Sequence, residues 1–353
     1  MVTSAADPPM TAPLPLPRPS LAEILDGAVA VSLPMRTRFR GQDAREVMLL
    51  RGPLGWAEFA PFPEYTAPET AAWLAAAVEA GWSGLGEPHR TQIPINATLP
   101  AVPPEQVEAV LWGFGDPGSI PAVKIKVAEP GQSLEDDLAR FREAARLVPQ
   151  AGLRADANAG WTHQQALRAI TALAEECGER IEYVEQPVPG VEGLAELREA
   201  LQARGLAVRL AADEAVRKAE DPLRVARLGA ADLIVVKAPP LGGVAAAAEI
   251  VRASGLDAVV SSALDSSVGL TAGLALAARL ESLPYACGLG TAALLAEEVV
   301  NEPLIPEDGV LAVPHRHGVI AAPEPDPELV ARHRVSAERQ RWWEDRVRAA
   351  YGG

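Results

Sequence analysis

The feature that most constrains the fold is a regular alternation of strand-like and helix-like segments between Pro94 and Leu289. Short β-branched runs are each followed by a longer segment with apolar residues three and four positions apart. The pattern predicts eight strands and seven clear intervening helices, one of them over Lys218–Leu228. Strands that alternate with helices at a near-constant period pair in parallel, so we predict a closed (β/α) barrel.

A different pattern precedes this alternation. Residues 28–62 read as strands with a turn at residues 52–55, and Pro68 opens an amphipathic helix. We therefore predict an α/β protein with a modified (β/α)7β TIM-like barrel over residues 93–296. An α+β capping domain is expected over residues 20–92 and completed by residues 297–353, with a flexible tail at residues 1–19.

The charge balance and the cysteine content exclude several classes of protein. Lys and Arg number 32 against 47 for Asp and Glu, and no basic run stands out, so nucleic acid is not an expected partner. Cys177 and Cys287 form no CxxC pair, which argues against a disulfide scaffold or a zinc site and favours a cytoplasmic protein. No apolar run approaches the roughly 20 residues of a membrane helix, so no membrane partner is expected. The sequence does not indicate an oligomeric state.

Two lysines share one face of the predicted strand Val123–Val127. Side chains at positions i and i+2 of a strand point the same way, so Lys124 and Lys126 lie side by side. If that face looks into a closed barrel, mutual repulsion and lost hydration favour the neutral form of at least one amine, which can then accept a proton. The alternative is that the two lysines flank an exposed edge strand.

Charged residues also end four consecutive predicted strands: Asp156, Glu185, Asp213 and Lys237. The carboxyl ends of barrel strands form the rim where active sites lie, so the three carboxylates are expected to converge there, with Lys126 on one flank and Lys237 on the other. Carboxylate oxygens alone favour a hard cation, Mg²⁺ first and Mn²⁺ second.

Each of these positions also has an ordinary structural interpretation. Asp156 could cap the following helix, Glu185 could begin a loop, and Lys237 could be a surface lysine. For Asp213 the neighbouring Glu214 is an equally charged candidate. The occurrence of all of them at consecutive strand ends favours a metal-assisted site.

These residues resemble the enolase superfamily, in its muconate-lactonizing subgroup. The likeness rests on Lys124-Ile125-Lys126, Asp156, Glu185, Asp213 and Lys237, and it covers nearly the whole chain. Within the subgroup, the chain is most similar to the o-succinylbenzoate synthase family of menaquinone biosynthesis, in its actinobacterial form. That closer likeness is carried by residues 55–62 (GWAEFAPF), 261–269 (SSALDSSVG) and 288–291 (GLGT).

The resemblance implies a small-molecule substrate and a lyase reaction, the Mg²⁺-dependent syn-dehydration of 2-succinyl-6-hydroxy-2,4-cyclohexadiene-1-carboxylate to o-succinylbenzoate. Lys126 would remove the proton next to the carboxylate and then protonate the departing hydroxyl, while Lys237 would stabilise the enediolate. The resemblance assigns the metal to Asp156, Glu185 and Asp213. Substrate contacts are expected from Lys124, Arg154, Asn158, Ser262, Gly288 and Leu289, of which the last three would line the succinyl end. Lys124 would also favour the neutral form of Lys126, and Arg154 shares the face of Asp156.

Two alternatives remain. N-acylamino acid racemases and dipeptide epimerases resemble this chain in both flanking lysines, although residues 288–291 lack the Asp-x-Asp pair expected of a dipeptide epimerase. A non-catalytic barrel used as a scaffold is disfavoured, because all the lysines and carboxylates are present.

Overall fold

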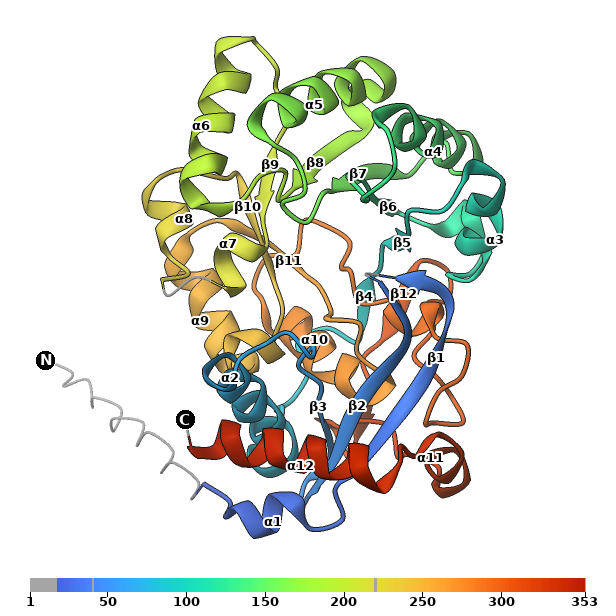
Figure 1. Ribbon diagram of the computed structural model, residues 1–353, viewed down its shortest axis with the longest axis vertical. Coiled ribbons are helices and arrows are strands. Elements are labelled where there is room, and N and C mark those ends of the chain that lie inside the picture. The colour runs from blue at the N-terminus through green and yellow to red at the C-terminus, as the bar shows by residue number, and fades with distance from the viewer. Residues whose placement is uncertain (1–17, 40, 219–220, 353) are drawn as a thin grey trace, which may run out of the picture.

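The computed structural model describes residues 18–39, 41–218 and 221–352. Residues 1–17, which make up most of the predicted tail, lie outside the described residues. Figure 1 shows a ring of strands surrounded by helices above a smaller layer that contains both ends of the described chain. The chain is therefore an α/β protein with a barrel and a capping layer, as predicted.

The barrel is built around a seven-stranded parallel sheet in the order β11-β10-β9-β8-β7-β6-β5. Sequential strands lie next to one another, which is the order expected when each strand is followed by a helix. The strands are β5 (Ala97–Leu99), β6 (Ala122–Lys126), β7 (Gly152–Asp156), β8 (Ile181–Glu185), β9 (Leu210–Ala212), β10 (Leu233–Val236) and β11 (Asp257–Val260).

The predicted eighth strand closes the barrel through isolated bridges. Cys287 pairs in parallel with Ile95 just before β5, and Gly288 pairs in parallel with Ser261 just after β11. The amide of Ser262 donates to the carbonyl of Gly288 at 3.0 Å. Residues 287–288 therefore form the seam that joins the two edges of the sheet.

The outer helices follow the strands in sequence. They are α3 (Val107–Trp112), α4 (Leu134–Leu147), α5 (His163–Cys177), α6 (Gly190–Ala203), α7 (Glu214–Arg217), α8 (Arg224–Arg227), α9 (Val244–Ser254) and α10 (Ser267–Arg279). The single helix predicted over Lys218–Leu228 is wrong. The chain forms the short helices α7 and α8 instead, and Pro222, whose ring nitrogen cannot donate a helical hydrogen bond, lies between them.

The capping layer combines the start and the end of the described chain. The strands β1 (Val29–Phe39), β2 (Gln42–Gly52) and β3 (Gly55–Phe59) form an antiparallel sheet, accompanied by α1 (Leu21–Leu25) and α2 (Ala67–Val78). The turn at Gly52 needs glycine, because a Cβ there would lie 2.0 Å from the carbonyl oxygen of Gly81.

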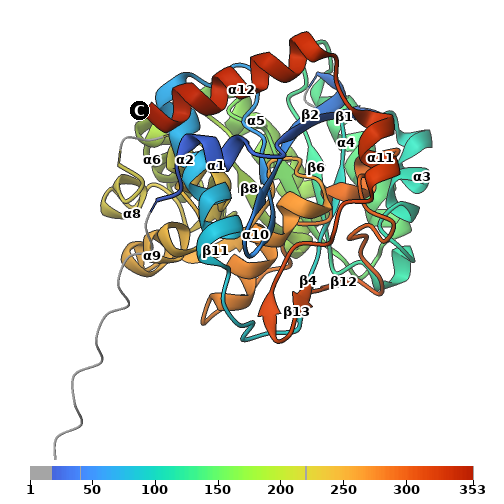
Figure 2. The same cartoon turned by 90° about the horizontal axis from the view of Figure 1, so that it is seen from below.

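Helix α12 (Ala337–Gly352), which follows α11 (Pro327–His333), packs against α2 and β1. Figure 2 shows α12 lying across this part of the molecule. The indole of Trp343 donates to Glu46 at 3.0 Å, and Arg346 donates to the carbonyl of Phe62 at 3.0 Å. Short strands complete the described chain: β4 (Gln92–Pro94) pairs with β12 (Val310–Ala312), and β13 (His315–Arg316) pairs with β14 (Val319–Ile320).

Two buried carboxylates join the cap to the barrel at the N-terminus of α10. Glu58, on β3, accepts hydrogen bonds from the amide and the hydroxyl of Ser266, and Glu298 accepts them from the amide and the hydroxyl of Ser267, at 2.6 and 2.7 Å. A helix N-terminus carries partial positive charge, so it favours acidic partners. Gly269 allows the close approach, because a Cβ there would lie 2.6 Å from Glu58 Oε1.

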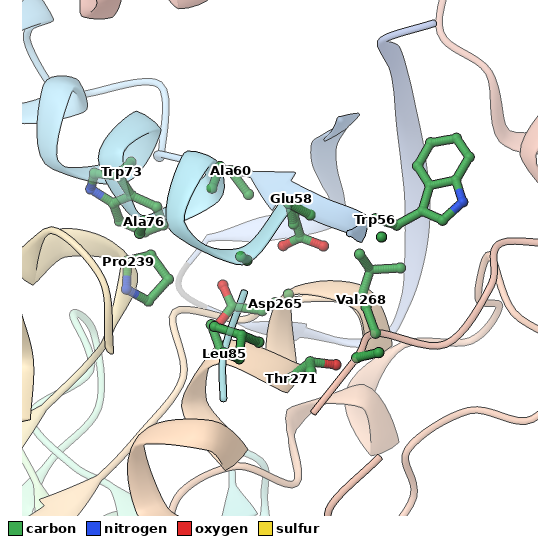
Figure 3. Close-up of a pocket in the computed structure, with 18 of the residues that line it drawn as sticks. Trp56, Glu58, Ala60, Trp73, Ala76, Leu85, Pro239, Asp265, Val268 and Thr271 are labelled. Carbon is green, nitrogen blue, oxygen red and sulfur yellow. The ribbon is translucent and has the colours of Figure 1, made fainter. Parts of the chain in front are cut away.

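Glu58 also faces a second carboxylate. Figure 3 shows the carboxyl groups of Glu58 and Asp265 pointing toward one another beside a small cavity of about 20 Å³. Burial and the nearby Asp265 raise the pKa of Glu58 to about 8, against the opposing effects of Ser266 and Arg45. Glu58 therefore keeps its proton at neutral pH, at the interface between the cap and the barrel.

Candidate active site

The lysine pair projects from a central strand of the barrel. Strand β6 lies between β5 and β7, and the side chains of Lys124 and Lys126 are 8% and 12% exposed. The edge-strand interpretation is therefore wrong. Lys126 Nζ donates to Asp156 Oδ2 at 2.5 Å and to Asn158 Oδ1 at 2.6 Å. Lys124 Nζ lies 3.3 Å from Glu185 Oε2 and 3.5 Å from Asp156 Oδ2.

Strand register explains why these groups meet. Lys126 is directly opposite Asp156 in the pairing of β6 with β7, and Asp156 is opposite Glu185 in the pairing of β7 with β8. Parallel strands end at the same edge of the sheet, so side chains at equivalent positions form one layer across the barrel. The two lysines and two carboxylates thus come from three neighbouring strand ends, as the sequence predicts.

The second amine lies against the third carboxylate. Lys237 directly follows β10, is buried, and donates from Nζ to Asp213 Oδ2 at 2.6 Å. The surface-lysine interpretation is therefore wrong. Arg217 Nε donates to the other oxygen of Asp213, Oδ1, at 2.9 Å. Asp213 is thus held between Lys237 and Arg217.

Burial and the mixed charges shift the ionisation of these groups in different directions. Burial raises the pKa of Glu185 to about 7, assisted by Asp156. Although burial opposes it, the charge of Lys126, with that of Lys124, lowers the pKa of Asp156 to about 2. The site therefore holds one carboxyl that ionises near neutral pH beside one that stays ionised.

The pKa values of Lys237 and Lys124 shift in opposite directions. Burial lowers the pKa of Lys237, with Asp213 opposing that effect. For Lys124 burial acts the same way, but the carboxylates of Glu185 and Asp156 outweigh it and raise the pKa above its ordinary value. The shift toward a neutral amine that was expected within the pair of Lys124 and Lys126 is therefore not found at Lys124.

The three carboxylates fit a hard divalent cation in their donor chemistry. Asp156, Glu185 and Asp213 offer only oxygen, the ligand type that Mg²⁺ prefers. The charges of Asp156 and Asp213 both raise the pKa of Glu185, so the three groups share one electrostatic environment. Within residues 18–39, 41–218 and 221–352, however, no group of three or more His, Cys, Asp or Glu side chains could hold a metal ion as it stands. Asp156 and Asp213 lie against the amines instead.

The other residues expected to contact the substrate fall into two places. Asn158 lies at the rim, in the left-handed region at φ 44°, with its side chain on Lys126. Ser262, Gly288 and Leu289 meet at the barrel seam, where Ser262 Oγ lies 2.7 Å from Thr291 Oγ1. Their part in binding the substrate stays a prediction.

Arg154 is placed differently from the rest of the predicted site. It pairs across the sheet with Lys124 and donates to Glu182 at 2.6 Å, to Asn96 at 2.9 Å and to the carbonyl of Ala286 at 2.7 Å. Arg154 is fully buried, and none of these contacts is with Asp156, Glu185 or Asp213. They favour a structural role for Arg154.

Sequence reasoning missed two residues that organise the site. The side-chain oxygen of Gln186 accepts from the amides of Asp213 and Ala215, both at 3.0 Å, and Gln186 adopts φ 38°. Arg217 contacts Asp213, Glu214 and the hydroxyl of Tyr65 from the cap. The only sequence signals were that Gln186 adjoins Glu185 and that Arg217 lies four positions after Asp213.

Lys126 and Asn158 open onto a cavity of about 540 Å³ between the barrel and the cap. The cap contributes Thr37, Arg38 and Gly41, from both sides of the β1–β2 turn. The volume lies within the range of about 300–1,000 Å³ that is typical of small-molecule sites. Lys126 therefore links the buried row of charged groups to an open cavity large enough for a small molecule.

A barrel with charged strand ends and a two-part cap is the architecture of one known class of proteins, and the sequence matches the models of that class. A family model described as "Enolase C-terminal domain-like" matches residues 106–326, and one described as "Enolase N-terminal domain-like" matches residues 30–81. The chain belongs to the enolase superfamily. Members of this superfamily typically use a divalent metal ion.

Curated relatives make the similarity more specific. The chain is 49% identical over 337 residues to an o-succinylbenzoate synthase of Mycobacterium ulcerans, which covers 95% of this chain and 97% of that protein. It is 47% identical over 333 residues to the o-succinylbenzoate synthase of Mycobacterium tuberculosis, covering 94% and 96%.

Solved structures show the same fold. The chain resembles a 2-chloromuconate cycloisomerase from Rhodococcus opacus with a TM-score of 0.72 and 23% identity, covering 88% of this chain and 98% of that one. A muconate lactonizing enzyme from Pseudomonas fluorescens, crystallised with muconolactone, gives a TM-score of 0.71 at 21% identity, covering 87% and 98%. In the described part of the chain, no helix is long and apolar enough to cross a membrane.

Proposed function

We propose that this chain catalyses the o-succinylbenzoate synthase reaction, the dehydration of 2-succinyl-6-hydroxy-2,4-cyclohexadiene-1-carboxylate in menaquinone biosynthesis. Support comes from the curated relatives, which match along nearly the full length at 47–49% identity. The observation that carries the proposal is the placement of an amine on either side of three buried carboxylates, with Lys126 against Asp156 and Lys237 against Asp213.

Asp156, Glu185 and Asp213 are the proposed ligands of Mg²⁺, with Mn²⁺ as a substitute. The bound ion supplies positive charge next to the substrate carboxylate, where negative charge develops when the neighbouring proton leaves. Gln186 fixes the start of α7 and with it Asp213, through its bonds to the amides of Asp213 and Ala215.

Lys126 is the proposed acid and base. Asn158 and Asp156 hold its amine at the rim of the cavity, within reach of a substrate bound there. In a syn elimination one group can remove the proton and then protonate the leaving hydroxyl, since both lie on the same face of the ring. Lys237 lies buried beside Asp213, where its charge stabilises the other face of the reacting carboxylate. Lys124, paired with Glu185, would contact the substrate carboxylate.

The direct test is an assay of the purified protein with the cyclohexadiene carboxylate in one reaction and an N-succinyl amino acid in another. The proposed function predicts that the first substrate is converted to o-succinylbenzoate in the presence of Mg²⁺. Turnover of the N-succinyl amino acid alone would instead favour a racemase, which can use the same two amines as acid and base on opposite faces. No turnover and no α-proton exchange with either compound would favour a non-catalytic barrel.

The proposal extends to organisation and location. Residues 20–92 together with 297–353 would form the cap, and residues 93–296 would form the catalytic barrel. The chain would act in the cytoplasm on a small carboxylate, without nucleic acid or membrane partners.

A further inference from the structure

The lining of the cavity beside Lys126 indicates how the far end of the substrate is bound, if the substrate is that of the proposed function. The proposed substrate carries two carboxylates, one on the ring and one at the end of the succinyl chain. The proposed function assigns the ring carboxylate to Lys124 and to the metal ion that Asp156, Glu185 and Asp213 would hold. The second carries a full negative charge, and a cavity that holds it needs a cation or several hydrogen-bond donors.

The cavity beside Lys126 contains one other cationic side chain among its described lining residues, that of Arg38. Lys126 itself is engaged by Asp156 and Asn158. Arg38 is exposed and makes no hydrogen bond or ion pair within the described part of the chain. Its guanidinium is therefore available to a ligand.

Among the described lining residues, the remaining walls offer no equivalent donor. Gln132 already donates to the carbonyl of Ala101 at 2.8 Å and accepts from Arg140. Pro100, Val102 and Pro103 present apolar surface suited to a short methylene chain. Glu129 is the acidic side chain of the described lining, and its charge disfavours a carboxylate that lies closer to it than to Arg38.

Arg38 is also placed at the end of the cavity that belongs to the cap. It lies near the end of β1, beside the turn into β2, and Figure 1 shows this hairpin reaching toward the barrel strands β5 and β6. Lys126 lies at the barrel end of the same cavity. A ligand held at both ends would span from the rim of the barrel to the cap.

We propose that Arg38 binds the distal carboxylate of the substrate and thereby sets a preference for dicarboxylates over monocarboxylates. A guanidinium presents two parallel donors that match a carboxylate, which a lysine does not reproduce. Arg38 acts on binding and not on the chemical step, because proton transfer takes place at the opposite end of the cavity.

Three variants test this role. Arg38→Gln removes the charge, Arg38→Lys keeps the charge without the paired donors, and Arg36→Gln removes an equally exposed charge two positions away that does not line the cavity. We expect Arg38→Gln to raise KM for the cyclohexadiene dicarboxylate about ten-fold or more, with kcat changed less than about three-fold. The KM of Arg38→Lys should lie between those of Arg38→Gln and the unmodified protein. The KM of Arg36→Gln should equal that of the unmodified protein.

A binding comparison isolates the contact. Calorimetry would measure the affinity of the unmodified protein and of Arg38→Gln for o-succinylbenzoate and for 2-butyrylbenzoate, which lacks the distal carboxylate. The unmodified protein should prefer the dicarboxylate about ten-fold, and Arg38→Gln should lose that preference. An unchanged preference in Arg38→Gln, or an equal loss of affinity for both ligands, would overturn the role of Arg38. Absence of dehydration by the unmodified protein would overturn the proposed function instead.

Discussion

The buried carboxylate of Glu58 makes a quantitative prediction about stability and pH. Its ordinary pKa is 4.5, and burial together with Asp265 raises it to about 8 in the folded chain. Between those two values the folded chain keeps a proton that the unfolded chain releases. The free energy of unfolding therefore falls as the pH rises from about 5 to about 8. Below that window both states are protonated, and above it both are ionised, so Glu58 adds no further slope.

The size of the effect follows from the shift. Each pKa unit corresponds to about 1.4 kcal/mol, so the full shift would cost about 5 kcal/mol across the window if Glu58 acted alone. That is a large part of the 5–15 kcal/mol that typically holds a native protein together. Glu58→Gln should remove most of this slope, because the amide oxygen can still accept from Ser266 while its NH₂ faces Asp265.

The measurement is urea unfolding at several pH values between 5 and 9 for the unmodified protein, Glu58→Gln, and Glu196→Gln as an exposed control on α6. Asp265 and Glu298 also have raised pKa values, so the informative quantity is the difference between the curves for the unmodified protein and Glu58→Gln. The control should keep the slope of the unmodified protein. Parallel curves for Glu58→Gln and the unmodified protein would refute the raised pKa of Glu58.

Three further predictions concern the site and its support. Lys126→Ala and Lys237→Ala should each lower kcat about 10²–10⁴-fold in the dehydration assay, and near-normal turnover of Lys126→Ala would contradict its role as acid and base. Treatment with EDTA should abolish turnover and added Mg²⁺ should restore it; activity that persists after exhaustive chelation would contradict the metal assignment. Gly269→Ala should lower the free energy of unfolding by about 1–3 kcal/mol in a urea titration, because its Cβ would lie 2.6 Å from Glu58 Oε1, and an unchanged midpoint would contradict that packing.

The sequence predicts the barrel and the position of its charged groups because both follow from local periodicity. Once strands alternate with helices, Asp156, Glu185 and Lys237 must come to the same end of the barrel. The pairing of Lys126 with Asp156 follows from the same register. The fold class and the central charges were therefore predictable without coordinates.

What the sequence does not predict depends on contacts between distant segments. Arg154 shares a strand face with Asp156, but which way its long side chain turns is decided by Asn96 and the carbonyl of Ala286, on other segments. Burial alone would lower the pKa of Lys124, but the carboxylate of Glu185, 61 positions away in the sequence, acts in the opposite direction. Gln186 and Arg217 organise the site through their hydrogen-bond partners, and no periodic pattern in the sequence encodes which partners they have.

The arrangement of the cap has a consequence for how the protein is made. The indole of Trp343 reaches Glu46 across 297 positions of sequence, so β1 and β2 leave the ribosome long before the helix that covers them. An apolar face of those strands therefore stays uncovered while the barrel is synthesised. Folding during translation should therefore complete the barrel before the cap, and until then the β1–β2 hairpin exposes apolar surface that a chaperone could bind.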